Sequence, residues 1–186
     1  MTQDIITWLK STRVNSRGVF QVEARPSESP VFEKGVGASC RFSVNFVLDN
    51  PLWRGTRERE HIFKQPGRAS IYNNSGIETP FILRGVVPPN SLFSIENLTT
   101  GKSIVLRNRK SFDMQFELDT SSCNVLAQKV ADGNMESANY IFTASSDLDM
   151  FLESGENVLR YAIDGDYYND EKAISIIVYD RYVGVV

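Results

Sequence analysis

The feature that most constrains the fold is the alternation of apolar and polar residues in the middle of the chain, between positions 92 and 118. Three runs carry this pattern, and their apolar members are Phe93, Ile95, Ile104, Leu106, Phe112, Met114, Phe116 and Leu118. A period of two places one set of side chains on the buried face of a sheet and the other set in water. Thr100 and Gly101 separate the first two runs, and glycine adopts the positive φ of a tight hairpin turn without strain. We therefore expect a meander of three antiparallel strands here.

Further short strands are expected on both sides of this segment, from Ala69 to the end of the chain. The strand patterns lie at residues 69–73, 79–87, 124–130 and 139–145. A single helical turn is expected at 146–152, where Ser146 and Asp149 have capping-box spacing. The chain then closes with a long hairpin, whose apolar residues are Leu159, Tyr161 and Ile163 on one strand and Ile174, Ile176 and Val178 on the other. Many short strands, polar turns and almost no helix predict an antiparallel β-sandwich over residues 69–186.

Residues 1–53 form a smaller predicted unit that has too few strands to be stable alone. A short amphipathic helix is expected over residues 2–12, because three apolar residues share one face at i, i+3, i+4 spacing. Two alternating strands follow at 20–24 and 40–48, joined by a long loop rich in proline and glycine. A two-stranded hairpin is marginal even with one face covered. This unit therefore requires more sheet, from the rest of the chain or from another subunit.

Residues 54–68 interrupt the strand pattern with arginine, lysine, glutamate, proline and glycine. We interpret them as a charged, solvated connector between the two units. A basic groove for nucleic acid and a contact strip between subunits are the alternatives. The interleaved glutamates and the lack of a series of stacking aromatic residues argue against the nucleic-acid groove.

The composition excludes several other classes of partner. A net charge of −3 gives no electrostatic reason to expect nucleic acid or an anionic membrane as partner. No apolar run approaches the roughly 18 residues of a membrane-spanning helix, and the first residues lack the pattern of a secretion signal. We expect a soluble protein that is made without export, in which the isolated Cys40 and Cys123 stay reduced.

The sequence offers little catalytic chemistry. His61 is the sole histidine and lies in the charged connector, and the motifs of hydrolases, zinc proteases and nucleotide-binding loops are absent. We expect no enzyme, no cofactor and no metal. The acidic loop at 164–171 lacks the glycine and glutamate positions of an EF-hand calcium loop. Its Tyr167 and Tyr168 can stack on a sugar or a partner protein, and a solvated hairpin tip is the plainer interpretation.

The order of the segments in the second half of the chain resembles a known family. These segments are TPFILRGVVPPNSLFSIENLTTGKSIVLR, FELDTSS, NYIFTASSDLDMFLESGENVLRY and AISIIVYDRYVGV. The most telling motifs are I-x-N-x-T-T-G from Ile95 to Gly101, Leu118-Asp119-Thr120, S-D-L-x-x-x-L from Ser146 to Leu152, and G-E-N from Gly155 to Asn157. Together they are similar to the galectin-like C-terminal sandwich of the distal tail proteins of long-tailed bacteriophages. Upstream, WLK, FQVEA and ASCRFSVNFVLDNPLW look like the closing helix and hairpin of that family's N-terminal belt domain, whose opening strands have no counterpart in this sequence.

The resemblance implies a structural virion protein of the tail tip. Such proteins form a ring, commonly a hexamer, that joins the tail tube to baseplate or receptor-binding proteins; the expected location is the virion, after assembly in the host cytoplasm. Strands that lack partners within a chain can pair across subunits. The candidate interface residues are Phe20, Val22, Phe42, Val44, Phe46 and Trp53. The competing hypothesis is a carbohydrate-binding sandwich that contacts host-surface glycans through Trp53, Tyr167 and Tyr168.

Overall fold

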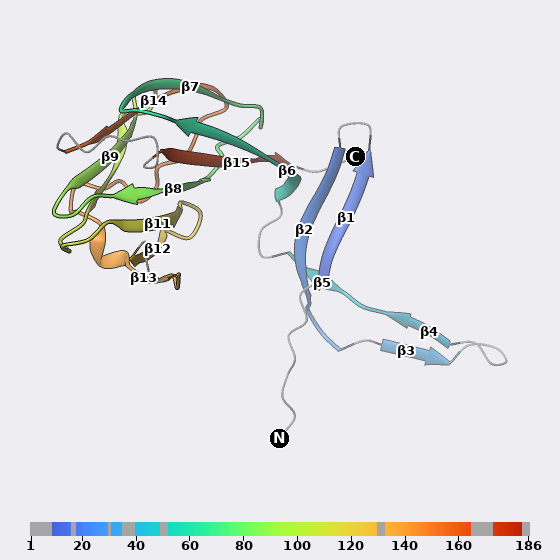
Figure 1. Cartoon of the computed structure of the whole chain (residues 1–186). Helices are drawn as coiled ribbons and strands as arrows, with labels where there is room; N and C mark the ends of the chain where they lie inside the picture. Colours follow the sequence, from blue (N-terminus) through green and yellow to red (C-terminus); the bar gives the residue numbers. More distant parts are fainter. Residues whose placement is uncertain are drawn as a thin grey trace. The chain divides into compact units, whose positions relative to one another are not determined.

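The structure, a computed structural model, describes residues 9–15, 18–29, 31–34, 40–48, 52–129, 133–164 and 173–183 (Figure 1). The chain divides into two compact units, one of residues 1–56 with 181–186 and one of residues 57–180. Within the described ranges, no helix is long and apolar enough to cross a membrane.

The smaller unit consists of short antiparallel strand pairs. Its strands are β1 (Leu9–Asn15), β2 (Gly18–Pro26), β3 (Val31–Lys34), β4 (Cys40–Ser43), β5 (Phe46–Val47) and the start of β6 (Leu52–Phe63). β1 and β2 form a hairpin, β2 also pairs with β5 and with the start of β6, and β3 pairs with β4. β2 therefore pairs with three other strands of this unit.

The helix expected over residues 2–12 is wrong where the structure describes that segment. Leu9 begins β1 and pairs with Ala24 of β2, whereas residues 2–8 lie outside the described residues. A helix of so few residues has little stability of its own. The β-branched Thr12 and Val14 favour an extended backbone, and pairing with β2 gives the backbone groups of the segment their hydrogen bonds.

The long hairpin expected between residues 20–24 and 40–48 is correct only at its base. β2 meets the second segment through Arg25↔Val47 and Pro26↔Phe46. The intervening stretch is not a plain loop, because β3 and β4 pair within it as a separate ribbon. The expected single strand at 40–48 is thus divided into β4 and β5.

The segment expected as a charged connector is largely strand. β6 covers Leu52–Phe63, and β7 begins at Gly67. The side chains of Arg57, Glu58 and Glu60 are exposed. The polar composition of this stretch therefore reflects a strand that faces solvent, and charge alone does not distinguish such a strand from a loop.

The larger unit is built from two antiparallel sheets. The first has the order β6, β15 (Ile174–Val183), β8 (Phe81–Val87), β11 (Met114–Asp119), β12 (Asn124–Lys129) and β13 (Glu136–Ser137). The second has the order β10 (Lys102–Arg107), β9 (Leu92–Asn97), β14 (Gly155–Ile163) and β7 (Gly67–Asn73). A short 3-10 helix, η1 (Asn139–Ile141), follows β13.

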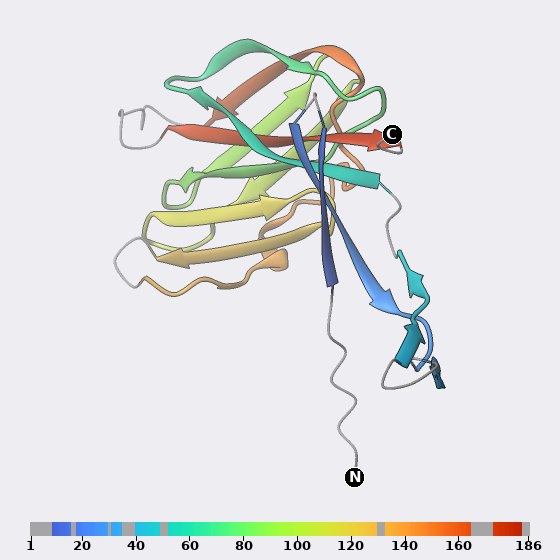
Figure 2. The ribbon, with the colours of Figure 1, turned by 90° about the vertical axis from the view of Figure 1, so that its right-hand side faces the viewer.

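The two sheets of the larger unit face each other (Figure 2). Their facing side chains form one apolar core. Alternate residues along β8, β9, β11 and β14 are buried, as the period-two pattern predicts. Phe93 of β9 contacts Phe116 of β11 in the other sheet, with ring centroids 5.3 Å apart. Phe63 of β6 contacts Tyr161 of β14 at 6.1 Å. The prediction of a mainly β fold with antiparallel sheets is confirmed, and two sheets around one core are what a β-sandwich requires.

The expected meander is correct for β9 and β10 and wrong for the third strand. β9 and β10 form a hairpin in which Gly101 has a φ of 74° and donates its N–H to the Asn97 carbonyl at 2.7 Å. β11 pairs instead with β8 and β12 in the other sheet. The buried Asn108 explains the change of sheet, because it fixes the crossing segment by donating to the carbonyls of Val87 at 2.9 Å and Phe112 at 2.8 Å.

The expected closing hairpin and helical turn are also wrong. β14 pairs with β7 and β9, whereas β15 pairs with β8, so the two strands lie in different sheets. Residues 146–152 form turns: Ser146 accepts a hydrogen bond from the Val105 N–H at 3.0 Å and donates to its carbonyl at 2.8 Å. This contact covers the edge of β10. The strand expected at 139–145 begins instead with η1.

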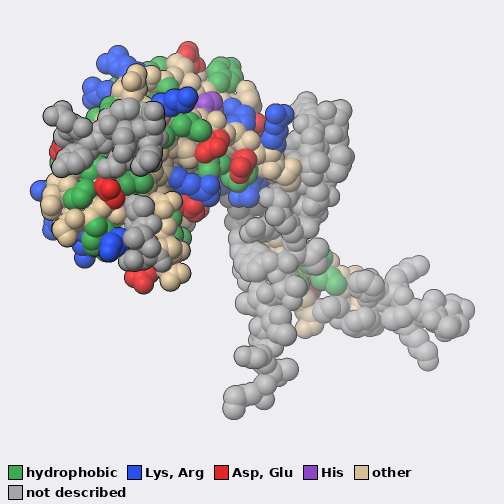
Figure 3. Space-filling view, in the orientation of Figure 1, with side chains coloured by type: hydrophobic (Ala, Val, Ile, Leu, Met, Phe, Trp, Pro, Cys, Tyr) green, Lys and Arg blue, Asp and Glu red, His purple; other side chains and the backbone are tan. Residues whose placement is uncertain are grey.

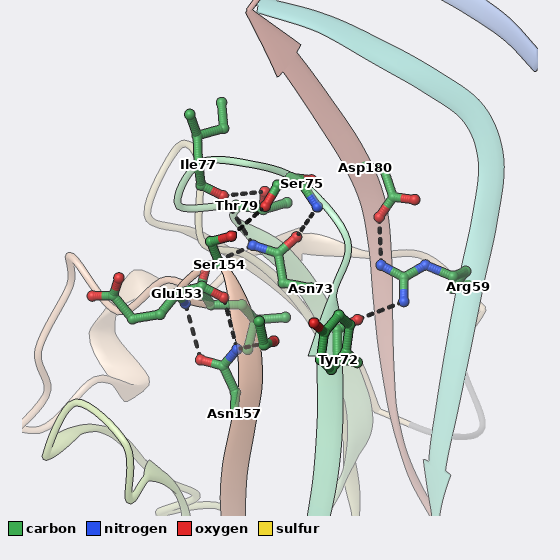
Figure 4. A network of polar contacts seen from close by, with 12 residues as sticks. Arg59, Tyr72, Asn73, Ser75, Ile77, Thr79, Glu153, Ser154, Asn157 and Asp180 are labelled. Carbon is green, nitrogen blue, oxygen red and sulfur yellow. Dashed lines mark hydrogen bonds and ion pairs between the residues drawn. The ribbon is translucent and has the colours of Figure 1, made fainter. Parts of the chain in front are cut away.

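Buried polar side chains hold the turns of the larger unit together (Figure 4). Asn157, from the G-E-N motif, donates to the Glu153 carbonyl at 2.8 Å and accepts from the Glu153 N–H at 2.9 Å. Asn97, from the I-x-N-x-T-T-G motif, donates to Asn157 Oδ1 at 2.9 Å. Thr120, from the Leu118-Asp119-Thr120 motif, accepts from the Phe81 N–H at 2.9 Å. These three motif residues therefore have a structural role.

Candidate interaction surfaces

The structure places the residues of the predicted assembly interface in different surroundings. Val22 of β2 is only 5% exposed, so this chain itself covers it. Val44 is half-buried and Phe46 is exposed. Of the described side chains in this set, Phe46 is the most accessible to another molecule. For the remaining members the structure describes the backbone only; these are Phe20, Phe42 and Trp53.

Three consecutive apolar residues are exposed at β5, and we call them the β5 patch. Phe46, Val47 and Leu48 are 44%, 42% and 38% exposed. Neighbouring residues of a strand point to opposite faces, so both faces of β5 are only partly covered by the described residues. Hydrophobic side chains reach the surface beside β5 in Figure 3. Contiguous exposed apolar residues are typical of contact sites between proteins.

The loop expected to contact a glycan or a partner lies outside the described residues. Tyr167 and Tyr168 both belong to that part of the chain, and so do most of the surrounding acidic residues. The hypothesis of a glycan or partner contact at this loop therefore stays a prediction.

Charges of both signs are interspersed on the face of the larger unit seen in Figure 3. Several basic residues of the larger unit form ion pairs with acidic ones. Arg84 pairs with Glu117 at 2.6 Å, and Lys102 pairs with Asp149 at 2.8 Å. Such a surface lacks, on that face, the continuous basic stripe that nucleic-acid binding requires.

Arg59 of β6 joins the two sheets of the larger unit (Figure 4). It forms an ion pair with Asp180 of β15, and its Nη1 donates to the Tyr72 carbonyl of β7 at 2.6 Å. Burial, and secondly the charge of Arg59, lower the pKa of His61 below its usual value. His61 Nε2 has no hydrogen-bond partner among the described residues. The contacts of Arg59 thus link three strands of the larger unit.

The described residues contain no group of three or more histidine, cysteine, aspartate or glutamate side chains that can hold a metal ion.

A concave site lies at the end of the β11–β12 pair, with a volume of about 340 Å³. We call it the Tyr140 groove. Its lining includes Lys110, Phe112, Gln128, Lys129, Glu136 and Tyr140. Reasoning from the sequence missed this groove, because three separate segments supply its lining.

The fold of this chain is similar to that of a solved phage protein. The likeness to the crystal structure of the Dit protein (gp 19.1) of phage SPP1 covers 87% of this chain, with a TM-score of 0.60 and 13% sequence identity. The same match covers 60% of the SPP1 protein, so this chain spans less than two thirds of its length. That protein is described as a paradigm of the hub adsorption apparatus in phages that infect Gram-positive bacteria. No protein-family model matches the sequence, and a comparison with curated proteins finds no match. At this level of identity the likeness establishes a shared fold.

Proposed function

We propose that this chain is a structural component of a phage tail tip and acts as an adaptor without catalysis. The observation that carries the proposal is the fold likeness to SPP1 Dit over 87% of the chain. The ordered motifs of the second half of the sequence support the same conclusion. The proposed assembly is a ring of identical subunits, taken to be a hexamer with galectin-like sandwiches. This ring joins the tail tube to baseplate or receptor-binding proteins, within a virion assembled in the host cytoplasm.

The β5 patch is the part of the described surface that supports assembly. Phe46 and Val47 sit on a strand that pairs with β2 through two residue pairs, so the sheet of the smaller unit gives them little cover. Burial of apolar surface contributes about 25 cal/mol per Å², so covering a patch of roughly 200 Å² contributes about 5 kcal/mol. A contact of this kind between neighbouring subunits is large enough to influence association.

Light scattering coupled to size-exclusion chromatography tests the proposal on the full chain. A protein concentration of about 100 μM is high enough to populate complexes with micromolar dissociation constants. We expect a closed oligomer that negative-stain electron microscopy shows as a ring. Phe46→Asp should shift the population towards smaller species. The matched control is Leu148→Asp, at a 48% exposed leucine of the larger unit, and it should leave the oligomer intact. A wild-type protein that is strictly monomeric, or an equal effect of both variants, would refute the proposal.

A further inference from the structure

The Tyr140 groove has a rigid frame on the side that carries Lys110 and Phe112. Asn108 is fully buried, and its side chain donates to the Phe112 carbonyl at 2.8 Å. Its Oδ1 accepts the Lys110 N–H at 2.8 Å, and the Lys110 carbonyl accepts the Asn90 N–H at 3.2 Å. The backbone between Lys110 and Phe112 is therefore fixed before any ligand arrives.

The opposite wall of the groove is equally well anchored. Tyr140 lies in η1 between Asn139, whose Oδ1 accepts the Val125 N–H at 2.7 Å, and Ile141, which is fully buried. The Tyr140 side chain is nevertheless 67% exposed. A fixed backbone that presents a largely exposed aromatic ring is the arrangement on which a flat ligand can stack.

The charges in the groove favour an anionic ligand. The Lys110 ammonium lies 5.8 Å from the centre of the Tyr140 ring, and the Lys129 ammonium lies 5.6 Å from the centre of the Phe112 ring. Neither lysine forms an ion pair with a carboxylate of the described residues. Glu136 is the acidic residue of the lining, so two positive charges face one negative charge.

One buried polar atom of the groove has no partner. The Gln128 amide donates through Nε2 to Gln115 at 2.9 Å, but its buried Oε1 accepts no hydrogen bond from the residues that the structure describes. A buried acceptor without a donor is unfavourable by about the energy of a lost hydrogen bond. This atom is closed to solvent, so a ligand in the groove does not reach it.

We propose that the Tyr140 groove binds an anionic saccharide, that is, a sugar ring that carries a carboxylate or a phosphate. The ring stacks on Tyr140, and the acidic group lies between Lys110 and Lys129. A volume of about 340 Å³ accommodates a monosaccharide unit. The site is separate from the predicted contact loop at Tyr167 and Tyr168, and it does not depend on the proposed tail-tip role.

An acidic peptide fits the groove less well. A peptide that binds in extended form gains its affinity from a ladder of backbone hydrogen bonds along a sheet edge. The edge strand beside the groove, β13, is only two residues long (Glu136–Ser137). It offers too short a ladder, whereas stacking and charge act on a single sugar unit.

The test is a titration of the isotope-labelled full chain, followed by amide chemical shifts. The anionic ligands are methyl β-glucuronide, which carries a carboxylate, and glucose 1-phosphate, which carries a phosphate. We expect saturable shifts at Lys110, Gln128 and Tyr140 with at least one of them, and at least about fivefold weaker binding of neutral methyl β-glucoside. The ligand that binds more tightly identifies the acidic group that the site prefers.

Two pairs of variants separate the groove from the rest of the surface. Tyr140→Ala and Lys110→Ala should each weaken binding at least about fivefold, because each removes one exposed contact. Their matched controls, Tyr72→Ala and Lys64→Ala, alter an exposed tyrosine and an exposed lysine elsewhere and should leave the affinity unchanged. Amide spectra of the free variants check that each is folded.

Four outcomes would overturn the assignment. They are the absence of saturable shifts with both anionic sugars up to about 20 mM, equal affinity for the neutral sugar, equal losses in the control variants, and binding of a hexaglutamate peptide without binding of either sugar. The last outcome would identify the groove as a contact site for acidic peptides.

Discussion

Replacing Asn108 with alanine should destabilise the larger unit strongly, although the side chain is polar and lies between strands. The Asn108 amide donates to the carbonyls of Val87, Pro88 and Phe112 at 2.8 to 3.0 Å, and its Oδ1 accepts the Lys110 N–H. Two N–H hydrogens and one acceptor correspond to three full hydrogen bonds. Each buried group left without its partner costs about 1–3 kcal/mol, so the loss of three hydrogen bonds is expected to cost at least about 3 kcal/mol. That is a large part of the roughly 5–15 kcal/mol that stabilises a typical domain.

Urea unfolding monitored through amide signals of the larger unit measures this loss, because signals from one unit avoid mixing two transitions. Asn124→Ala, at a half-buried asparagine that begins β12, is the matched control and should change stability by less than about 0.5 kcal/mol. Asn108→Asp should be at least as damaging at neutral pH, since it sets a carboxylate against carbonyl oxygens, and part of the stability should return on acidification. A loss below about 1 kcal/mol for Asn108→Ala would refute the argument that this side chain fixes the crossing between the sheets.

Three further predictions follow from single contacts in the larger unit. Gly85→Ala places a Cβ 2.1 Å from Ile174 Cδ1 and should cost about 1–3 kcal/mol in urea unfolding. The double variant with Ile174→Val, which removes that methyl group, should recover part of this loss, and full stability of the single variant would contradict the prediction. The hydrogen bond from Lys102 lowers the pKa of Asp149. The stability that this contact contributes is therefore present above the ordinary aspartate range and is lost as pH falls through the lowered pKa. In Lys102→Met, a carboxyl NMR titration should show that the pKa of Asp149 rises. Burial and the nearby Arg59 lower the pKa of His61, so an NMR titration of the histidine ring should give a midpoint below about 6.5. The protein should lose stability as pH falls below the ordinary histidine range, because the unfolded chain then binds the proton more readily. A normal or raised midpoint would show that the ring is solvated.

Reasoning from the sequence located most strands of the larger unit but few of those in the smaller unit. Phe93, Ile95, Phe116 and Leu118 are buried as their alternation predicts, since neighbouring side chains of a strand point to opposite faces. In the smaller unit, helical spacing over a few residues gave the wrong structure for the segment that begins at Leu9. A pattern of three apolar residues is too short to outweigh the pairing that a neighbouring strand offers.

The Tyr140 groove illustrates what sequence reasoning cannot find. Lys110, Gln128 and Tyr140 are far apart in the chain, and none belongs to a recognisable motif. A groove exists only once β11, β12 and η1 are packed together. The signals present in the sequence, such as a lysine before an aromatic residue, occur by chance too often to identify a site.

Local sequence patterns suffice to establish that the chain is mainly β, which side chains of each central strand face the core, and where the tight turn at Gly101 falls. These properties are local, because side-chain direction and turn geometry depend on adjacent residues. Tertiary structure alone decided that β11 leaves β9 and β10 for the other sheet and that β14 and β15 do not pair with each other. The partner of a strand is set by distant contacts such as those of Asn108 and by the packing of Phe93 on Phe116, and a one-dimensional pattern does not encode them.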